Sequence, residues 1–214
     1  MIKYPIIKRR KIKLKRYNKT QIKELSNLLK NNGVISVPTD TVYGICGSIK
    51  SRKAQTKLKE IKNRPASKLF PIMCADIEQI KSIAIIDNKS EKIIKKFMPG
   101  PITIVVRKNS QLPEYINNGK ETIAIRMATS KELKELIKSL GCPVFMTSAN
   151  KSGEEVCKTL EEIEKNCPDL DGMLEGEVSF RQASTIVDCT LDEIKILREG
   201  PISKDEIMKI LNNL

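Results

Sequence analysis

The fold is decided by the stretch Val34-Ile35-Ser36-Val37-Pro38-Thr39-Asp40-Thr41-Val42-Tyr43-Gly44-Ile45. Its apolar, β-branched start predicts a buried strand, which ends at Pro38 because proline cannot donate to a sheet ladder. Hydroxyls and a carboxylate follow before a second apolar run. They therefore lie at a rigid strand end, where open α/β sheets usually hold their ligands. The same local pattern is equally typical of an ordinary polar turn between two strands.

Strand and helix patterns alternate on both sides of this stretch. Short apolar runs predict further strands at 5–16, 69–74, 103–107, 122–127, 143–146, 170–174, 184–189 and 193–197. Capping residues ahead of apolar residues at helical spacing predict helices that begin at Thr20, Ser51, Asp76, Ser90, Ser130, Thr159 and Ser203. Because the strands outnumber those of a simple βαβ alternation, we expect an α/β fold with a mixed sheet flanked by helices. A single domain over 1–214 is the default for this length.

The composition suits a globular protein with no membrane span. Apolar residues make up 40% of the chain and charged residues 30%, and no run approaches the roughly 20 apolar residues that a membrane span needs. The N-terminus lacks the apolar region of a secretory signal. The six cysteines show no CxxC spacing, and a chain of this length needs no disulfide staples. We therefore expect buried free thiols and a cytoplasmic location.

Histidine is absent from the sequence. This excludes Ser-His-Asp and Cys-His nucleophiles, acid–base catalysis by histidine and most zinc sites. Any catalysis must rest on lysine, arginine, hydroxyls, carboxylates or backbone amides. Such groups favour the electrostatic stabilisation of anions, as in phosphate chemistry.

The positive charge gathers at the N-terminus. Of the net charge of +13, ten charges lie in residues 1–23, which contain no acid: Lys3, Lys8, Arg9, Arg10, Lys11, Lys13, Lys15, Arg16, Lys19 and Lys23. A basic arm of this kind can bind nucleic acid. It is also typical of a solvated edge strand, whose lysines discourage strand-to-strand aggregation. We favour the edge strand within 1–19, because Ile12 and Leu14 alternate with charged residues.

Polar side chains recur where the predicted strands and helices end. They are Thr39, Thr41, Lys62, Arg64, Ser67, Lys68, Thr122, Arg126, Ser148, Asn150, Ser184, Thr185 and Arg198. An arginine inside an apolar strand, such as Arg126, needs an anionic partner, which is either a carboxylate of the protein or one of a ligand. Thr122 shares a strand face with it. Since the sequence has neither a Walker A pattern nor GxGxxG, a phosphate site would have to combine separate loops.

Seven segments in order resemble motifs of the YrdC/TsaC family, the L-threonylcarbamoyladenylate synthases, over residues 20–202. They are Pro38-Thr39-Asp40-Thr41-Val42-Tyr43-Gly44, Lys62-Asn63-Arg64-Pro65, Pro99-Gly100-Pro101-Ile102-Thr103, Thr122-Ile123-Ala124-Ile125-Arg126-Met127, Ser148-Ala149-Asn150, Ser184-Thr185-Ile186-Val187-Asp188 and Leu197-Arg198-Glu199-Gly200. The set is very specific, although Ser-Ala-Asn alone means little. The resemblance implies a YrdC-like twisted mixed sheet around a central basic cavity.

The resemblance also implies an activity. The family joins ATP, bicarbonate and L-threonine into threonylcarbamoyl-AMP and pyrophosphate, and other enzymes transfer the threonylcarbamoyl group to a tRNA adenosine beside the anticodon. Threonine would be bound by Thr39, Arg126, Met146 (through its backbone) and Ser184. ATP would be bound by Lys62, Arg64, Thr122, Ser148, Asn150 and Arg198, with Ser67 and Lys68 nearby. Partners would include tRNA or the threonylcarbamoyl-transferase complex.

Three of these residues are the expected catalytic groups. Lys62, Arg64 and Arg198 suit phosphates and the charge that builds up in the transition state. Mg²⁺ would arrive with ATP, and we expect no metal site made by the protein alone.

The chain departs from the family pattern at several places. Lys68 is followed by Leu69-Phe70-Pro71, and Met73 stands where a histidine is often found. Arg181-Gln182-Ala183 replaces a segment that is commonly rich in glycine, and Arg181 could add a phosphate ligand. Because the sequence ends at Leu214, we expect it to lack the second C-terminal domain of longer family members.

Two other functions remain open. The same basic cavity and arm could serve a non-catalytic module that binds double-stranded RNA or tRNA. Four tyrosines, four phenylalanines and no tryptophan argue against it, because they offer little base stacking. A carbamoyl-transfer domain like those of hydrogenase maturation proteins is the other possibility, although such domains normally adjoin further domains.

Overall fold

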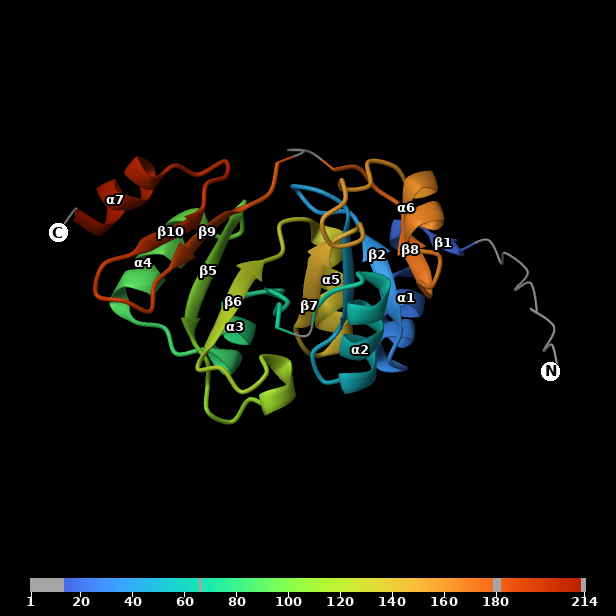
Figure 1. Ribbon diagram of the computed structural model, residues 1–214, viewed down its shortest axis with the longest axis horizontal. Coiled ribbons are helices and arrows are strands. Elements are labelled where there is room, and N and C mark those ends of the chain that lie inside the picture. Colours follow the sequence, from blue (N-terminus) through green and yellow to red (C-terminus); the bar gives the residue numbers. More distant parts are fainter. Residues whose placement is uncertain (1–13, 66, 179–181, 213–214) are drawn as a thin grey trace, which may run out of the picture.

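The structure is a computed structural model that describes residues 14–65, 67–178 and 182–212 (Figure 1). In this part of the chain a ten-stranded sheet has the order β1-β8-β2-β3-β7-β4-β6-β5-β9-β10. The strands are β1 (Arg16–Tyr17), β2 (Val34–Val37), β3 (Gly44–Ser48), β4 (Ile72–Cys74), β5 (Ile102–Arg107), β6 (Thr122–Met127), β7 (Val144–Ser148), β8 (Gly172–Leu174), β9 (Thr185–Asp188) and β10 (Lys195–Arg198).

The sheet is mixed, as the sequence predicts. β8 pairs in parallel with β1 and β2, β4 with β6 and β5 with β9, whereas the other neighbours are antiparallel. The stretch that decides the fold forms the antiparallel pair of β2 and β3, in which Val37 lies opposite Gly44. Residues 38–43 are therefore the turn between these two strands.

Helices flank the sheet (Figure 1). They are α1 (Ile22–Lys30), α2 (Arg52–Ile61), α3 (Ile77–Ile83), α4 (Asn88–Phe97), α5 (Lys131–Leu140), α6 (Leu160–Asn166) and α7 (Lys204–Asn212), with short 3₁₀ helices η1 (Lys19–Gln21) and η2 (Glu114–Ile116). α1 packs against α5, α2 against β3 and α4 against α7. Leu25 and Leu29 of α1 and Leu58 of α2 are completely buried, because each helix turns its apolar stripe inward.

Most of the predicted helix starts are confirmed. The side chains of Ser51, Asp76, Ser130 and Thr159 each accept a backbone N–H three residues further on. The capping box of Ser203 and Glu206 is also present, since each side chain accepts the other residue's amide.

Two predicted helix caps are wrong in position. Asn18, not Thr20, caps the first helical segment, because its side chain accepts the Thr20 amide and η1 precedes α1. Asp87, not Ser90, caps α4, because its carboxylate accepts the Ser90 amide at 2.8 Å. The predicted strand 5–16 lies mostly outside the described residues, and only its end contributes to β1.

Gly200 lies against the backbone that leads into β9. A Cβ atom here would stand 2.4 Å from the Thr185 nitrogen and 2.6 Å from the Ala183 oxygen. Both are backbone atoms, so a side chain could enter only if the chain moved. The absence of a side chain at Gly200 therefore lets the end of β10 approach the start of β9.

Replacing Gly200 with alanine should lower the free energy of unfolding by about 1–3 kcal/mol, because the new methyl group is forced against rigid backbone. Urea unfolding followed by circular dichroism measures this. Its exposed neighbour provides the control, since Glu199→Ala should change stability by less than ~0.5 kcal/mol. Equal midpoints for wild type and Gly200→Ala would contradict the packing argument.

Candidate functional site

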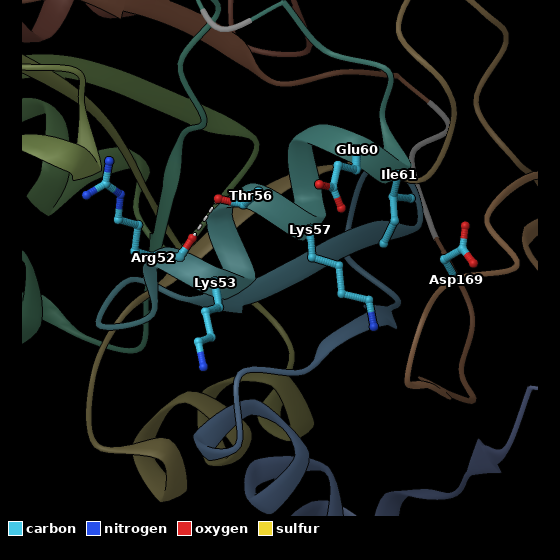
Figure 2. A pocket seen from close by; sticks show the side chains of 7 residues that line it. All are labelled: Arg52, Lys53, Thr56, Lys57, Glu60, Ile61 and Asp169. Carbon is cyan, nitrogen blue, oxygen red and sulfur yellow. Dashed lines mark hydrogen bonds between the residues drawn. The ribbon is translucent and has the colours of Figure 1, made fainter.

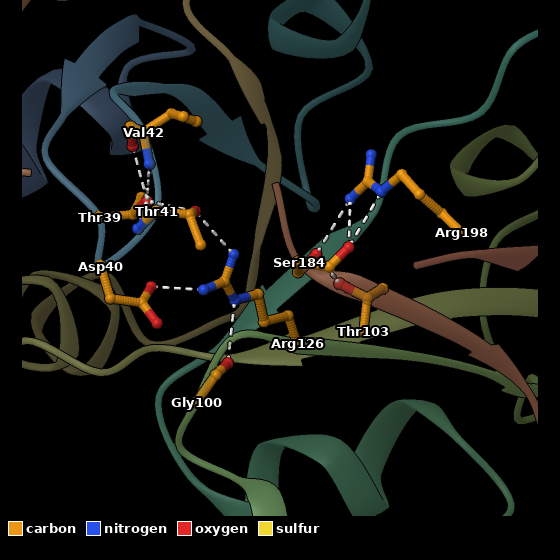
Figure 3. A network of polar contacts seen from close by, with 9 residues as sticks. All are labelled: Thr39, Asp40, Thr41, Val42, Gly100, Thr103, Arg126, Ser184 and Arg198. Atoms are coloured by element: carbon orange, nitrogen blue, oxygen red, sulfur yellow. Dashed lines mark hydrogen bonds and ion pairs between the residues drawn. The ribbon is translucent and has the colours of Figure 1, made fainter. Parts of the chain in front are cut away.

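Arg126 is a buried arginine in β6, with 7% of its surface exposed. Its Nε donates to the Gly100 carbonyl at 3.2 Å, one terminal nitrogen donates to the Thr41 hydroxyl at 3.0 Å, and the other pairs with the Asp40 carboxylate (Figure 3). The anionic partner that the sequence requires is thus a carboxylate of the protein itself. A guanidinium has five N–H donors, so these three contacts leave two of them for a ligand.

The side chains of the turn between β2 and β3 have two different roles. The Thr39 hydroxyl donates to the Val42 carbonyl at 2.6 Å and accepts the amides of Thr41 and Val42, each at 3.2 Å. Thr39 therefore closes the turn, while Asp40 and Thr41 reach Arg126 (Figure 3). The sequence did not predict these contacts of Asp40 and Thr41 with Arg126. The proposed contact of Thr39 with threonine stays a prediction.

A second group of polar contacts joins β5, β9 and β10. Arg198 donates to the Ser184 carbonyl from Nε at 2.9 Å and from a terminal nitrogen at 2.8 Å, and that nitrogen is 3.1 Å from the Ser184 hydroxyl. The hydroxyls of Ser184 and Thr103 share a hydrogen bond of 2.9 Å. Burial, and then the charge of Arg126, lower the pKa of Arg198 below its usual range. The two arginines therefore lie near enough for their charges to interact, and Figure 3 shows both sets of contacts.

Lys62 joins the end of α2 to the end of β7. Its ammonium donates to the Ser148 carbonyl and to the Asn150 side-chain oxygen, both at 2.7 Å. Lys62 has 2% of its surface exposed, and both of these acceptors are neutral. Burial, and then the charge of Arg64, lower the pKa of Lys62 to about 8. The structure thus brings together three of the residues predicted to bind ATP.

Arg64 holds the loop that follows α2. Its Nε donates to the Lys68 carbonyl at 3.1 Å, and a terminal nitrogen donates to the Leu69 carbonyl. The guanidinium carbon lies 4.8 Å from the centre of the Phe70 ring. Burial lowers the pKa of Arg64 from its usual value. Lys68 and its neighbour Ser67, also predicted to lie near ATP, are exposed.

Thr122 and Met146 make backbone and packing contacts with other parts of the fold. Thr122 begins β6 and its carbonyl accepts from the Asn117 side chain at 3.1 Å. The Met146 amide donates to the Pro71 carbonyl at 2.9 Å, and its sulfur packs where a Cβ of Gly44 would stand. None of these contacts joins either residue to Arg126 or Lys62. Arg181, the further phosphate ligand considered above, lies outside the described residues.

Three residues that contact Arg126 or Ser184 were not assigned a role in the site from the sequence. Gly100 supplies a carbonyl to Arg126, Thr103 a hydroxyl to Ser184, and Asp40 the counter-charge. Gly100 and Thr103 belong to the Pro99–Thr103 motif, so the sequence marked their place. Only the fold shows what they contact.

Two cavities are present on other surfaces of the described chain. The larger, of about 910 Å³, lies along α2 and is lined by Arg52, Lys53, Thr56, Lys57, Glu60, Ile61 and Asp169 (Figure 2). The smaller, of about 370 Å³, is lined by Asn18, Lys19, Pro38, Ser130, Glu132, Glu175, Gly176 and Glu177. Neither contains a predicted site residue, so the central basic cavity stays a prediction.

The described residues provide neither a cluster of metal ligands nor a membrane-spanning helix. No group of three or more Cys, Asp or Glu side chains there could hold a metal ion. No described helix is long and apolar enough to cross a membrane. All six cysteines are free and buried, which confirms the expectation of unpaired thiols.

Two cationic groups are present, Arg126 with Arg198 and Lys62 with Arg64. Together with the fold, they define an α/β protein whose buried side chains suit anionic ligands. The family model of Sua5, YciO and YrdC, described as "Telomere recombination", matches residues 27–200. The chain belongs to this Sua5/YciO/YrdC family.

Similar proteins extend this result. The "Threonylcarbamoyl-AMP synthase" of Bacillus subtilis is 32% identical, over 91% of this chain and 57% of that protein. The "Putative threonylcarbamoyl-AMP synthase" of Methanocaldococcus jannaschii is 34% identical, over 92% of this chain and 97% of that protein. The crystal structure of Sua5 from P. abyssi complexed with L-threonine superposes with a TM-score of 0.86 at 26% identity, over 92% of this chain and 60% of that one. The chain thus spans less than two thirds of two of these three proteins.

Lys62 should make stability depend on pH. Its pKa is about 8 in the folded protein against an ordinary value of 10.5. Between these values the unfolded chain retains a proton that the folded protein has lost. Lys62 should therefore raise the free energy of unfolding as pH rises from about 8 to 10.5, by at most about 1.4 kcal/mol per pH unit.

The measurement compares urea unfolding of wild type and Lys62→Met across this pH range. The variant should lose the Lys62 contribution to the slope. Buried thiols whose raised pKa does not involve Lys62, such as Cys46 and Cys189, act in the opposite direction in both proteins, so their contribution cancels in the difference. Lys53→Met, an exposed lysine of the same helix, should leave the slope unchanged. Parallel curves for wild type and Lys62→Met would refute the buried-charge argument.

Proposed function

We propose that the protein synthesises L-threonylcarbamoyl-AMP and pyrophosphate from L-threonine, bicarbonate and ATP. The observation that carries the proposal is the buried guanidinium of Arg126, which keeps two N–H donors beyond its protein contacts. A planar guanidinium can hold a carboxylate bidentately, and the P. abyssi relative was solved with L-threonine. The names of the B. subtilis and M. jannaschii relatives support the same activity.

The proposed chemistry joins two anions. The threonine amine and bicarbonate give a carbamate and one molecule of water. One carbamate oxygen forms a bond to the α-phosphorus of ATP, and the bond from that phosphorus to the departing pyrophosphate breaks. Cations must screen the repulsion between carbamate and triphosphate before they meet. Lys62, Arg64 and Arg198 are the side chains suited to this task, and Arg126 is suited to the threonine carboxylate.

The nucleotide would lie on the side of Lys62. There the Ser148 hydroxyl and the Asn150 amide adjoin the ammonium, and they offer groups for phosphate or ribose. Thr122 would add a contact to ATP, and Ser184 and the Met146 backbone would add contacts to threonine. Mg²⁺ would arrive on the ATP phosphates. The ion would neutralise charge on the departing pyrophosphate, so that no histidine acid would be required.

The test is release of pyrophosphate by the purified protein with Mg²⁺. Release should require ATP, L-threonine and bicarbonate together. Arg126→Ala should reduce kcat/KM for threonine by about 100-fold, because truncating a buried, hydrogen-bonded charge costs 2–5 kcal/mol or more.

The control for this substitution is Arg52→Ala, an exposed arginine of α2 outside the two cationic groups, which should keep wild-type activity. Circular dichroism checks that both variants fold. Absence of threonine-dependent release from the wild type would refute the proposed reaction, whereas unchanged threonine use in Arg126→Ala would refute the role of Arg126.

The second candidate is a module that binds double-stranded RNA or tRNA, favoured by the ten positive charges of residues 1–23. Removal of residues 1–13 separates the two functions and leaves β1 intact, because β1 begins at Arg16. A synthase should keep its pyrophosphate release within about 2-fold, since none of its proposed site residues lies in 1–13.

An RNA module should instead lose affinity for tRNA and show a flatter salt dependence, because the deletion removes several phosphate contacts. Filter binding over a salt series measures this. If the truncated protein lost catalysis while its fold persisted, the arm would belong to the active site and the separation would be wrong.

We also propose a cytoplasmic location and delivery of the product to the enzymes that modify tRNA. Six buried free thiols support a reducing compartment. A mixed anhydride of a carbamate and AMP is a reactive acyl donor, so a transferase must consume it.

A further inference from the structure

One carboxylate oxygen of Asp40 has no hydrogen-bond partner among the described residues. One oxygen pairs with Arg126, but the other is buried and accepts no hydrogen bond from the described residues. Figure 3 shows the contact leaving from a single oxygen. A buried acceptor left unsatisfied costs about 1–3 kcal/mol, and more when it is charged. An ion pair that served only to neutralise Arg126 would be better made through both oxygens.

The charges around Asp40 make it the only place for a cation in this group. Of the residues labelled in Figure 3, Asp40 alone is acidic, whereas Arg126 and Arg198 are positive. The side chain of Asp40 keeps 12% of its surface exposed, so the pair lies at the margin of the solvent. A positively charged ligand group would be repelled by both arginines and attracted by the free oxygen of Asp40.

An α-amino acid matches this arrangement, because it carries a carboxylate and an ammonium on one carbon. Its carboxylate can take the two free N–H donors of Arg126. Its ammonium then lies beside Asp40, which is bound to the same guanidinium. We propose that Asp40 binds the ammonium group of the substrate, so that Arg126 and Asp40 together select a free amino acid in its zwitterionic form. This inference rests on the proposed function and adds a specificity residue to it.

Asp40 could act in two other ways. It could merely orient Arg126, in which case its loss weakens every carboxylate ligand equally. It could also occupy Arg126 in competition with the ligand, in which case its loss strengthens every carboxylate ligand. Only the proposed role makes the effect depend on the ligand's amine.

The test compares L-threonine with 3-hydroxybutanoate, which is threonine without its amine, by isothermal titration calorimetry. Wild type should bind threonine at least about 10-fold more tightly, as expected for a hydrogen bond to a charged group. Asp40→Asn should lose most of this preference, with threonine weakened about 10-fold and the analogue by less than about 3-fold. Thr41→Val, which removes an uncharged partner of Arg126, should weaken both ligands by the same factor.

The outcomes separate cleanly. Equal weakening or equal strengthening of both ligands by Asp40→Asn overturns the inference and leaves the proposed function intact. Failure of the wild type to bind L-threonine at all overturns both. Thermal unfolding shows whether Asp40→Asn folds. If the variant does not fold, the wild-type affinities for the two ligands still test the inference. Equal affinity for L-threonine and 3-hydroxybutanoate would mean that the amine is not recognised, and would overturn it.

Discussion

A buried positive charge that must be neutralised organises the centre of this protein. Arg126 lies inside β6, and removing a guanidinium from water costs several kcal/mol unless it is paired and hydrogen-bonded. Its partners come from two distant parts of the chain, the turn between β2 and β3 and the segment before β5. β7 and β4 separate β3 from β6 in the sheet. The pairing therefore fixes the turn across several strands and sets the shape of the site.

Arg198 and Lys62 have no carboxylate partner among the described residues. Arg198 donates to the carbonyl and hydroxyl of Ser184, and Lys62 to neutral oxygens of Ser148 and Asn150. Neutral acceptors satisfy the hydrogen bonds but leave the charge uncompensated. The region is consequently arranged to attract anions, and this follows from the contacts themselves without reference to any relative.

The sequence predicted the elements well because their signals are local. A capping side chain such as Ser51 or Ser130 acts within three residues. Proline ends a strand locally, and β-branched residues favour one. Where two candidate caps lie close together, as Asn18 and Thr20 do, the sequence cannot say which side chain accepts the amide. The turn between β2 and β3 shows even more clearly that the sequence does not reveal which side chain makes a given contact. Consecutive residues of a turn point in different directions, so spacing could not show that Thr39 faces inward to its own turn while Asp40 faces Arg126.

The two kinds of cation have different consequences for ligand binding. An arginine stays charged at any physiological pH, so Arg126 must always be neutralised, and Asp40 is needed whether or not a ligand is bound. Lys62 can lose its proton, because burial lowers its pKa to about 8. A bound polyphosphate would supply the missing negative charge and raise that pKa again. Binding of such an anion must then be coupled to proton uptake near and above pH 8, whereas binding of a carboxylate by Arg126 must not.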